Sequence, residues 1–336
     1  MELAFLLFVS VVVLALIFDY INGFHDAANA IATIVSTKVL SPRVAVIYGA
    51  ILNFIGALLG TKVATTVGAG LVNTQVVTSE VLLAALMAAI IWNLLTWYKG
   101  LPSSSSHALM GSLMGAVAFA TSTENLHWVT ITNKVIIPMF SSPVMGFIGG
   151  YFVMVALYWI FHKVNLPRIN AIFSKAQIVS CGYLAITHGA NDAQKTMGII
   201  ALAVAAYYQT PFHVSDWIIV SCAIAMGLGT VAGGWRIIKT VGSKIVKIKP
   251  IQGFAAEATG GTVLFLTAHF GIPISTTHTI TTSIMGVGSA KRFSALNPKV
   301  IINIVGSWFL TLPITFFLSG GLYKLAHWLL PMFTNS

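Results

Sequence analysis

Two short segments of the sequence carry a proline followed by hydroxyl side chains and a histidine. One reads LPSSSSH from Leu101, and the other reads IPISTTH from Ile272. A proline and small hydroxyl residues at the start of a helix leave free N–H and O–H donors at the positive end of the helix dipole, where an anion binds. Two such helix starts facing each other would replace the hydration of a tetrahedral oxyanion. The predicted substrate-binding residues are Ser104, Ser105, Ser106, Ser275, Thr276 and Thr277.

Buried carboxylates are the second chemical feature. The chain has eight acidic residues, and Asp26, Asp192 and Glu257 lie within apolar segments. An ionised carboxylate there is unfavourable unless it meets a cation, a proton or a basic partner. Amide side chains beside the two aspartates add oxygen ligands of the kind that a small cation prefers. The predicted coupling-cation residues are Asp26, Asp192 and Glu257, with Asn22, Asn29, Asn191 and Gln194.

Alternative roles remain open for these charges. Asp26 and Asp192 either hold a sodium ion or carry a proton. A structural ion pair of Asp192 or Glu257 with Lys195 is the competing explanation. Lys195 is thus a charge partner, either for the substrate or for one of the acids.

Four histidines fall inside these motifs: His25, His107, His188 and His278. Their spacing matches no metal-ligand motif, and the sequence shows no nucleophile with a base and no cofactor fingerprint. We expect His107 and His278 to orient or cap neighbouring groups. The sequence therefore predicts neither an enzyme nor a cofactor.

The composition indicates that a membrane holds these residues. Hydrophobic residues make up 57% of the 336-residue chain and charged residues only 8%, and the mean hydropathy is +0.89. Soluble domains carry about a quarter of their residues as charge. The net charge of +10 comes from basic residues between the apolar segments, a distribution typical of membrane proteins and not of nucleic-acid binding.

Apolar stretches long enough to cross a bilayer, about 20 residues each, recur along the whole chain. The predicted helices cover 3–37, 43–66, 80–98, 135–163, 176–208, 215–237, 251–270 and 300–330. The long segments 3–37 and 176–208 contain polar residues, so we expect each to be broken or strongly tilted. The shorter segments 103–120 and 274–290 are predicted to be re-entrant or discontinuous helices.

The motifs recur in the same order in the two halves of the chain. Asp26 and Asp192 are 166 residues apart, and His107 and His278 are 171 apart. A lone hydroxyl motif would be better explained by helix capping or close helix packing, but the repetition favours an anion site. Five crossings per half would invert the second half. The predicted fold is an all-α polytopic membrane protein of about 10–12 transmembrane elements, with inverted repeats at 1–163 and 176–336 and a short cytoplasmic linker at 164–175.

The basic residues predict the orientation. Fourteen of the 18 fall in gaps on one side if the N-terminus lies outside: Lys38, Arg43, Lys99, Lys163, Arg168, Lys175, Arg236, Lys239, Lys244, Lys247, Lys249, Lys291, Arg292 and Lys299. Because positive residues accumulate on the cytoplasmic side, both termini are predicted to be extracytoplasmic.

Longer motifs in both halves resemble the inorganic phosphate transporter family. They are GFHDAANAIAT from Gly23, AAIIWNLLTWYKGLPSSSSH ending at His107, HGANDAQKTMG from His188, GFAAE ending at Glu257 and GIPISTTH ending at His278. The resemblance spans nearly the whole chain. One departure is the short linker, where many members carry a long hydrophilic insert, and this indicates a minimal transport core.

The resemblance implies import of inorganic phosphate with sodium or with protons, the latter in some bacterial members with a metal–phosphate complex as substrate. It implies that Asp26 and Asp192 help to bind the coupling cation, and that hydroxyls near Ser104, Ser105, Ser275 and Thr276 contact the anion. We expect a multi-pass protein of the plasma (inner) membrane, in contact with lipid and plausible as a homodimer. A sulfate permease on the same fold and an anion channel are the alternatives.

Overall fold

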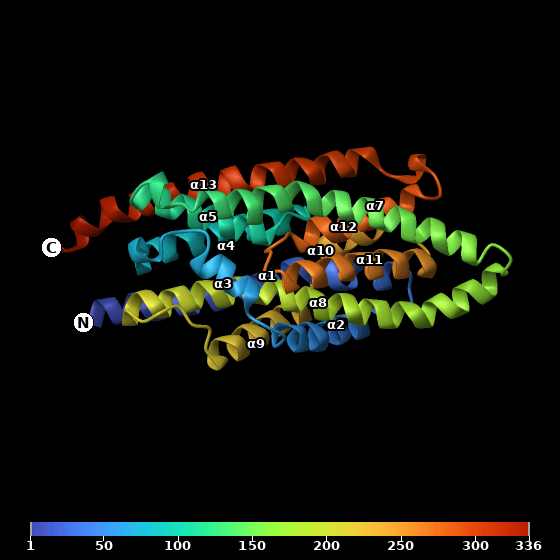
Figure 1. Cartoon of the computed structure of the whole chain (residues 1–336), viewed down its shortest axis with the longest axis horizontal. Coiled ribbons are helices and arrows are strands. Elements are labelled where there is room, and N and C mark those ends of the chain that lie inside the picture. Colours follow the sequence, from blue (N-terminus) through green and yellow to red (C-terminus); the bar gives the residue numbers. More distant parts are fainter. Residues whose placement is uncertain (1, 335–336) are drawn as a thin grey trace.

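The computed structural model describes residues 2–334, and these form an elongated bundle of helices (Figure 1). The helices are α1 (Glu2–Ser36), α2 (Pro42–Ala57), α3 (Lys62–Ala69), α4 (Ser79–Lys99), α5 (Ser105–Ala120), α6 (Trp128–Ile131), α7 (Ile137–Ile160), α8 (Leu166–Tyr208), α9 (Asp216–Ala232), α10 (Trp235–Lys239), α11 (Pro250–His269), α12 (Thr276–Ser289) and α13 (Pro298–Thr334). Within residues 2–334 there is no β-strand, only one isolated bridge between Val72 and Leu126. The all-α prediction is confirmed.

Several helices have the length and hydropathy of membrane spans. Five qualify alone, and the bent pairs α2 with α3 and α9 with α10 raise the number to seven within the described residues. Large apolar side chains such as Ile51, Phe152 and Phe317 are exposed on the outside, whereas Asp26 and Asp192 are buried. This distribution suits a protein surrounded by lipid, in which ionisable side chains face the bundle interior.

The structure corrects four expected elements. The predicted helices 43–66 and 215–237 are each bent at a break, by 72° and 61°, where Gly60 and Gly233 adopt positive φ angles that glycine tolerates. Of the two alternatives expected for 3–37 and 176–208, a break or a strong tilt, the break is absent, since α1 and α8 are each continuous. Helix α8 also begins ten residues early, since Asn165 caps it and Pro167 occupies its first turn. Most of the linker is therefore helical.

The helices of the two halves correspond in order. Helix α1 matches α8, the bent pairs match each other, α4 matches α11, α5 matches α12, and α7 matches α13. The halves interlock, because α1 packs on α9 while α2 packs on α8, and α5 packs on α13 while α12 packs on α7. Helices α1 and α8 run in opposite directions, and both termini lie at the same end (Figure 1). This arrangement supports the proposal of two inverted repeats.

Two glycines at matched positions let the half-helices approach their partners closely. A Cβ at Gly115 in α5 would clash with the carbonyl oxygen of Phe316, and one at Gly286 in α12 would clash with that of Phe147. We expect Gly115→Ala and Gly286→Ala each to destabilise the protein by about 1–3 kcal/mol, because a backbone atom cannot move aside as a side chain can. Thermal unfolding of the purified protein would measure the effect.

Gly306 in α13 provides the matched control, because a Cβ there meets no described atom within 4 Å. Gly306→Ala should leave the unfolding temperature unchanged or raise it, since alanine favours helices. Equal unfolding temperatures for all three variants would show that the close helix approach at Gly115 and Gly286 does not contribute to stability.

Candidate functional site

The two hydroxyl motifs begin short helices inside the protein. Ser104 is the N-cap of α5 and accepts a hydrogen bond from the His107 backbone N–H at 3.1 Å, and Ser275 caps α12 in the same way through His278 at 3.2 Å. The predicted substrate residues are all buried: Ser104, Ser105, Ser106, Ser275, Thr276 and Thr277. Their motif histidines meet, with the rings of His107 and His278 4.9 Å apart and edge to face. The two helix starts therefore lie together, as the repeated motif predicts.

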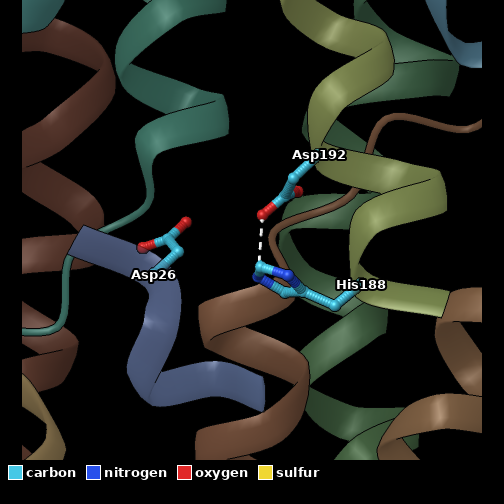
Figure 2. A group of neighbouring side chains, drawn as sticks. All are labelled: Asp26, His188 and Asp192. Atoms are coloured by element: carbon cyan, nitrogen blue, oxygen red, sulfur yellow. Dashed lines mark ion pairs between the residues drawn. The ribbon is translucent and has the colours of Figure 1, made fainter. Parts of the chain in front are cut away.

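Two long helices bring the buried acids to the same place. Asp26 lies on α1, while His188 and Asp192 lie one turn apart on α8 (Figure 2). One ligand atom from each of the three residues lies within 4.8 Å of the others. The His188 Nε2 atom is 3.1 Å from Asp192 Oδ2, and His25 Nδ1 is 2.7 Å from Asp26 Oδ1. Two carboxylates this close repel each other unless positive charge lies near them.

Hydroxyl groups of the second motif hydrogen-bond to both carboxylates. Thr276 donates to Asp192 Oδ2 at 2.9 Å, and Thr277 donates to Asp26 Oδ1 at 3.5 Å. The amide of Asn29 in turn donates to the hydroxyl oxygens of Thr276 at 3.2 Å and Thr277 at 2.9 Å. Two predicted anion residues, Thr276 and Thr277, thus form one connected network with three predicted cation residues: Asp26, Asn29 and Asp192.

Lys195 connects the network to the first motif. Its ammonium group donates to Asp192 and to the hydroxyl of Ser106, and to the carbonyl oxygen of Ile274 at 3.0 Å. It is only 2% exposed, so its charge is compensated by Asp192 and not by water. Since Ser106 lies in the first turn of α5 and Ile274 immediately precedes the N-cap of α12, one ammonium group contacts the starts of both helices.

Several buried oxygens accept no hydrogen bond from the residues that the structure describes. Those that belong to predicted cation residues are Asp26 Oδ2, Asn22 Oδ1, Asn29 Oδ1 and Asn191 Oδ1. A buried acceptor without a partner is unfavourable, and carboxylate and amide oxygens are ligands for small hard cations. Of these oxygens, Asp26 Oδ2 belongs to the group with His188 and Asp192, and Asn29 is linked to that group through Thr276 and Thr277, so these two residues could hold a cation there.

Two predicted residues have other partners. Gln194 accepts a hydrogen bond from the Val63 backbone N–H at 2.8 Å and donates to the Ala190 carbonyl at 2.5 Å, so it fixes the start of α3. Glu257 accepts hydrogen bonds from Thr33 at 2.6 Å, from Gln177 at 2.9 Å and from Ser180. The Glu257 cluster lies on helices that also carry the site, since Thr33 is one turn beyond Asn29 on α1, and Gln177 and Ser180 lie on α8 with Asp192.

The sequence interpretation overlooked the partners that orient the site. Thr96 and Ser103 lie 3.0 and 3.5 Å from His25 Nε2, and Ser105 lies 3.4 Å from its Nδ1. Asn53 lies 3.1 Å from His188 Nδ1. Polar residues in apolar helices, such as Asn53 and Gln177, were the available signal, because a membrane interior disfavours them unless they are bonded.

Comparison with known proteins identifies the family of the chain. Residues 22–319 match the model of the phosphate transporter family. The chain is 45% identical over 324 residues to a protein of Rhizobium meliloti named "Probable low-affinity inorganic phosphate transporter", covering 96% of this chain and 97% of that protein. It is 44% identical to a Bacillus subtilis protein of the same name, covering 99% of both.

A solved structure shares the fold. It is named "The sodium-dependent phosphate transporter", and it superimposes with a TM-score of 0.85 over 96% of this chain and 99% of the other, at 24% sequence identity. The family and these relatives consist of transporters and not of enzymes. On its sequence match and on the membrane-embedded network of hydroxyls and carboxylates, this chain belongs to the phosphate transporter family.

Proposed function

We propose that this protein moves inorganic phosphate across the membrane by symport with a cation, through alternating access around the buried site. One observation carries the proposal: Thr276 and Thr277, at the start of α12, hydrogen-bond to Asp192 and Asp26 on two different long helices. The proposed anion site and the proposed cation site therefore both include the hydroxyl groups of Thr276 and Thr277. A simple anion channel would not require the hydroxyl donors of its anion site to hydrogen-bond to carboxylates.

The shared hydroxyls give a physical basis for coupling. While Thr276 and Thr277 donate to the carboxylates, their hydrogens are not available to an anion. A cation bound by Asp26 and Asp192 would occupy the carboxylate lone pairs, so the hydroxyls could turn toward phosphate. The cation would also offset the negative charge that repels phosphate. Phosphate binding would then follow cation binding, and the inverted halves would move around the loaded site.

The ligand set favours sodium as the cation. The amide oxygens of Asn22, Asn29 and Asn191 are buried, belong to residues within four positions of Asp26 or Asp192 on the same helix, and accept no hydrogen bond from the described residues. An amide oxygen can coordinate a metal ion but takes up no proton near neutral pH. The structural relative is named as sodium-dependent, which agrees with this choice.

Radiolabelled phosphate uptake into proteoliposomes tests the proposal. Sodium and proton gradients are imposed separately, with unlabelled sulfate as competitor. We expect uptake that follows the sodium gradient and ignores sulfate. Uptake driven only by protons would show that the coupling ion is the proton and not sodium. Inhibition by sulfate would show that the site also accepts sulfate. Uptake independent of both gradients would indicate a channel.

The hydroxyls of Thr276 and Thr277 should affect both the affinity for phosphate and the affinity for the coupling cation. Replacing either by valine removes a hydrogen bond to a charged group, worth about 1.5–3 kcal/mol, so we expect the phosphate KM to rise about 10-fold or more. Thr277→Ser keeps the hydroxyl and should retain near-normal uptake. Thr262→Val is the control, because Thr262 is exposed on α11 and bonds only to the Ala258 carbonyl. An unchanged phosphate KM in both valine variants would show that these hydroxyls do not take part in phosphate binding.

A further inference from the structure

A cavity lined by basic and apolar residues lies far along the bundle from the two chain termini. Its volume is about 1150 Å³, and its walls come from the α7–α8 turn, the segment between α10 and α11, and the loop that follows α12. These segments gather at the end opposite the N- and C-termini (Figure 1). No lining residue of this cavity belongs to the network around Asp26 and Asp192, so the cavity is a separate feature of the molecule.

The cavity is strongly basic. Its lining includes Lys244, Lys247, Lys249, Lys291, Arg292 and His162, and the lysines at its mouth, such as Lys244 and Lys291, are exposed. None of its described lining residues is acidic. Positive residues brought together without carboxylates repel one another, and an anion in their midst relieves this repulsion.

The acidic residues of the chain lie elsewhere. Asp19, Asp26, Asp192 and Glu257 are buried in the bundle. Of the other four, Glu2, Glu80 and Asp216 lie in the first turns of α1, α4 and α9, and Glu124 lies in the segment after α5. None of them lines the cavity. The positive charge of the cavity is therefore not neutralised by the chain itself.

The remaining wall of the cavity is apolar, and its position matches the surface of a membrane. Leu157, Phe161 and Ile251 line it beside the lysines. Trp159, in the last turn of α7 next to these residues, is 82% exposed. Exposed tryptophans concentrate at the boundary between lipid headgroups and acyl chains. The cavity thus combines clustered cations with an apolar wall, next to an exposed tryptophan of the kind found at headgroup depth.

We propose that this cavity binds the phosphate headgroup of an anionic phospholipid, with the basic side chains around the phosphate and the acyl chains against the apolar wall. Basic pockets between membrane helices recognise lipid headgroups through the same chemistry. Free inorganic phosphate offers the same anionic oxygens, but it has no apolar part that could pack against the apolar wall. Since the lining includes the α7–α8 turn that connects the two halves and two loops of the second half, a bound lipid contacts both.

Lipid binding to the purified full-length protein tests the proposal. The protein in neutral detergent is titrated with phosphatidylglycerol, with phosphatidylcholine and with inorganic phosphate, and bound species are counted by native mass spectrometry. We expect saturable binding of phosphatidylglycerol and none of phosphatidylcholine. The variant Lys247→Gln/Lys249→Gln/Lys291→Gln should bind phosphatidylglycerol about 100-fold more weakly, because each basic residue near an anionic lipid contributes about a fivefold factor.

The matched control carries the same charge change outside the cavity. Lys38, Lys99 and Lys175 are predicted to lie on the same side of the membrane and do not line the cavity. Lys38→Gln/Lys99→Gln/Lys175→Gln should bind phosphatidylglycerol as the unaltered protein does. If inorganic phosphate displaced phosphatidylglycerol from the cavity, the cavity would be an anion site, but its occupant would be free phosphate and not a lipid. Equal phosphatidylglycerol binding by both triple variants, or equal binding of the two lipids, would overturn the proposal.

Discussion

Replacing Asp26 by asparagine is expected to abolish sodium-driven phosphate uptake while leaving the protein folded. Asparagine has the same shape but carries no charge. A unit charge at about 4 Å from a cation contributes about 4 kcal/mol at the effective dielectric constant of a protein, equivalent to about 1000-fold in cation affinity. Asp26 is 2% exposed, so water would replace little of that interaction. Sodium-dependence curves of uptake in proteoliposomes would measure the loss.

Asp216 supplies the control for this substitution. It lies in the first turn of α9 and belongs to no ion pair found among the described residues. Asp216→Asn changes the net charge by the same amount and should transport normally. If Asp26→Asn retained the sodium dependence of the unaltered protein at a normal unfolding temperature, Asp26 would not be a ligand of the coupling cation.

The Asp192–Lys195 pair separates a structural role from a transport role. Asp192→Asn leaves the Lys195 ammonium buried, with only the Ser106 hydroxyl and the Ile274 carbonyl as partners. Removing one member of a buried pair typically destabilises a protein by about 3–5 kcal/mol. We therefore expect Asp192→Asn to unfold at a clearly lower temperature and to lose uptake.

The double variant Asp192→Asn/Lys195→Gln distinguishes the two roles. It removes both charges, so it should regain most of the unfolding temperature. It should still fail to transport, because the carboxylate that accepts from Thr276 and lies beside His188 is gone. Recovery of uptake together with stability would mean that the pair is only structural. Thermal unfolding and uptake measured on the same preparations decide the outcome.

The chemistry of the site followed from local features of the sequence. The prolines and hydroxyls before His107 and His278 specify helix starts, because capping depends on residues within one turn. Asp26 and Asp192 were recognisable because a carboxylate in an apolar segment is unfavourable without a partner. The apolar segments and their repetition identified an all-helical membrane protein. Each of these signals acts over a few residues or through simple periodicity.

The tertiary structure decided which partners these residues have. That Thr276 donates to Asp192, that Lys195 reaches both half-helix segments and that Gln194 instead holds Val63 depend on how helices far apart in the chain rotate and cross. The early start of α8 and the bends near Gly60 and Gly233 come instead from local signals, a cap and two glycines, that hydropathy alone does not detect. The sequence by itself determined the residue types and their helices, because those depend on local propensity and polarity. Only the packed fold determined the hydrogen-bonded pairs, because a side chain's partner depends on the position of every helix around it.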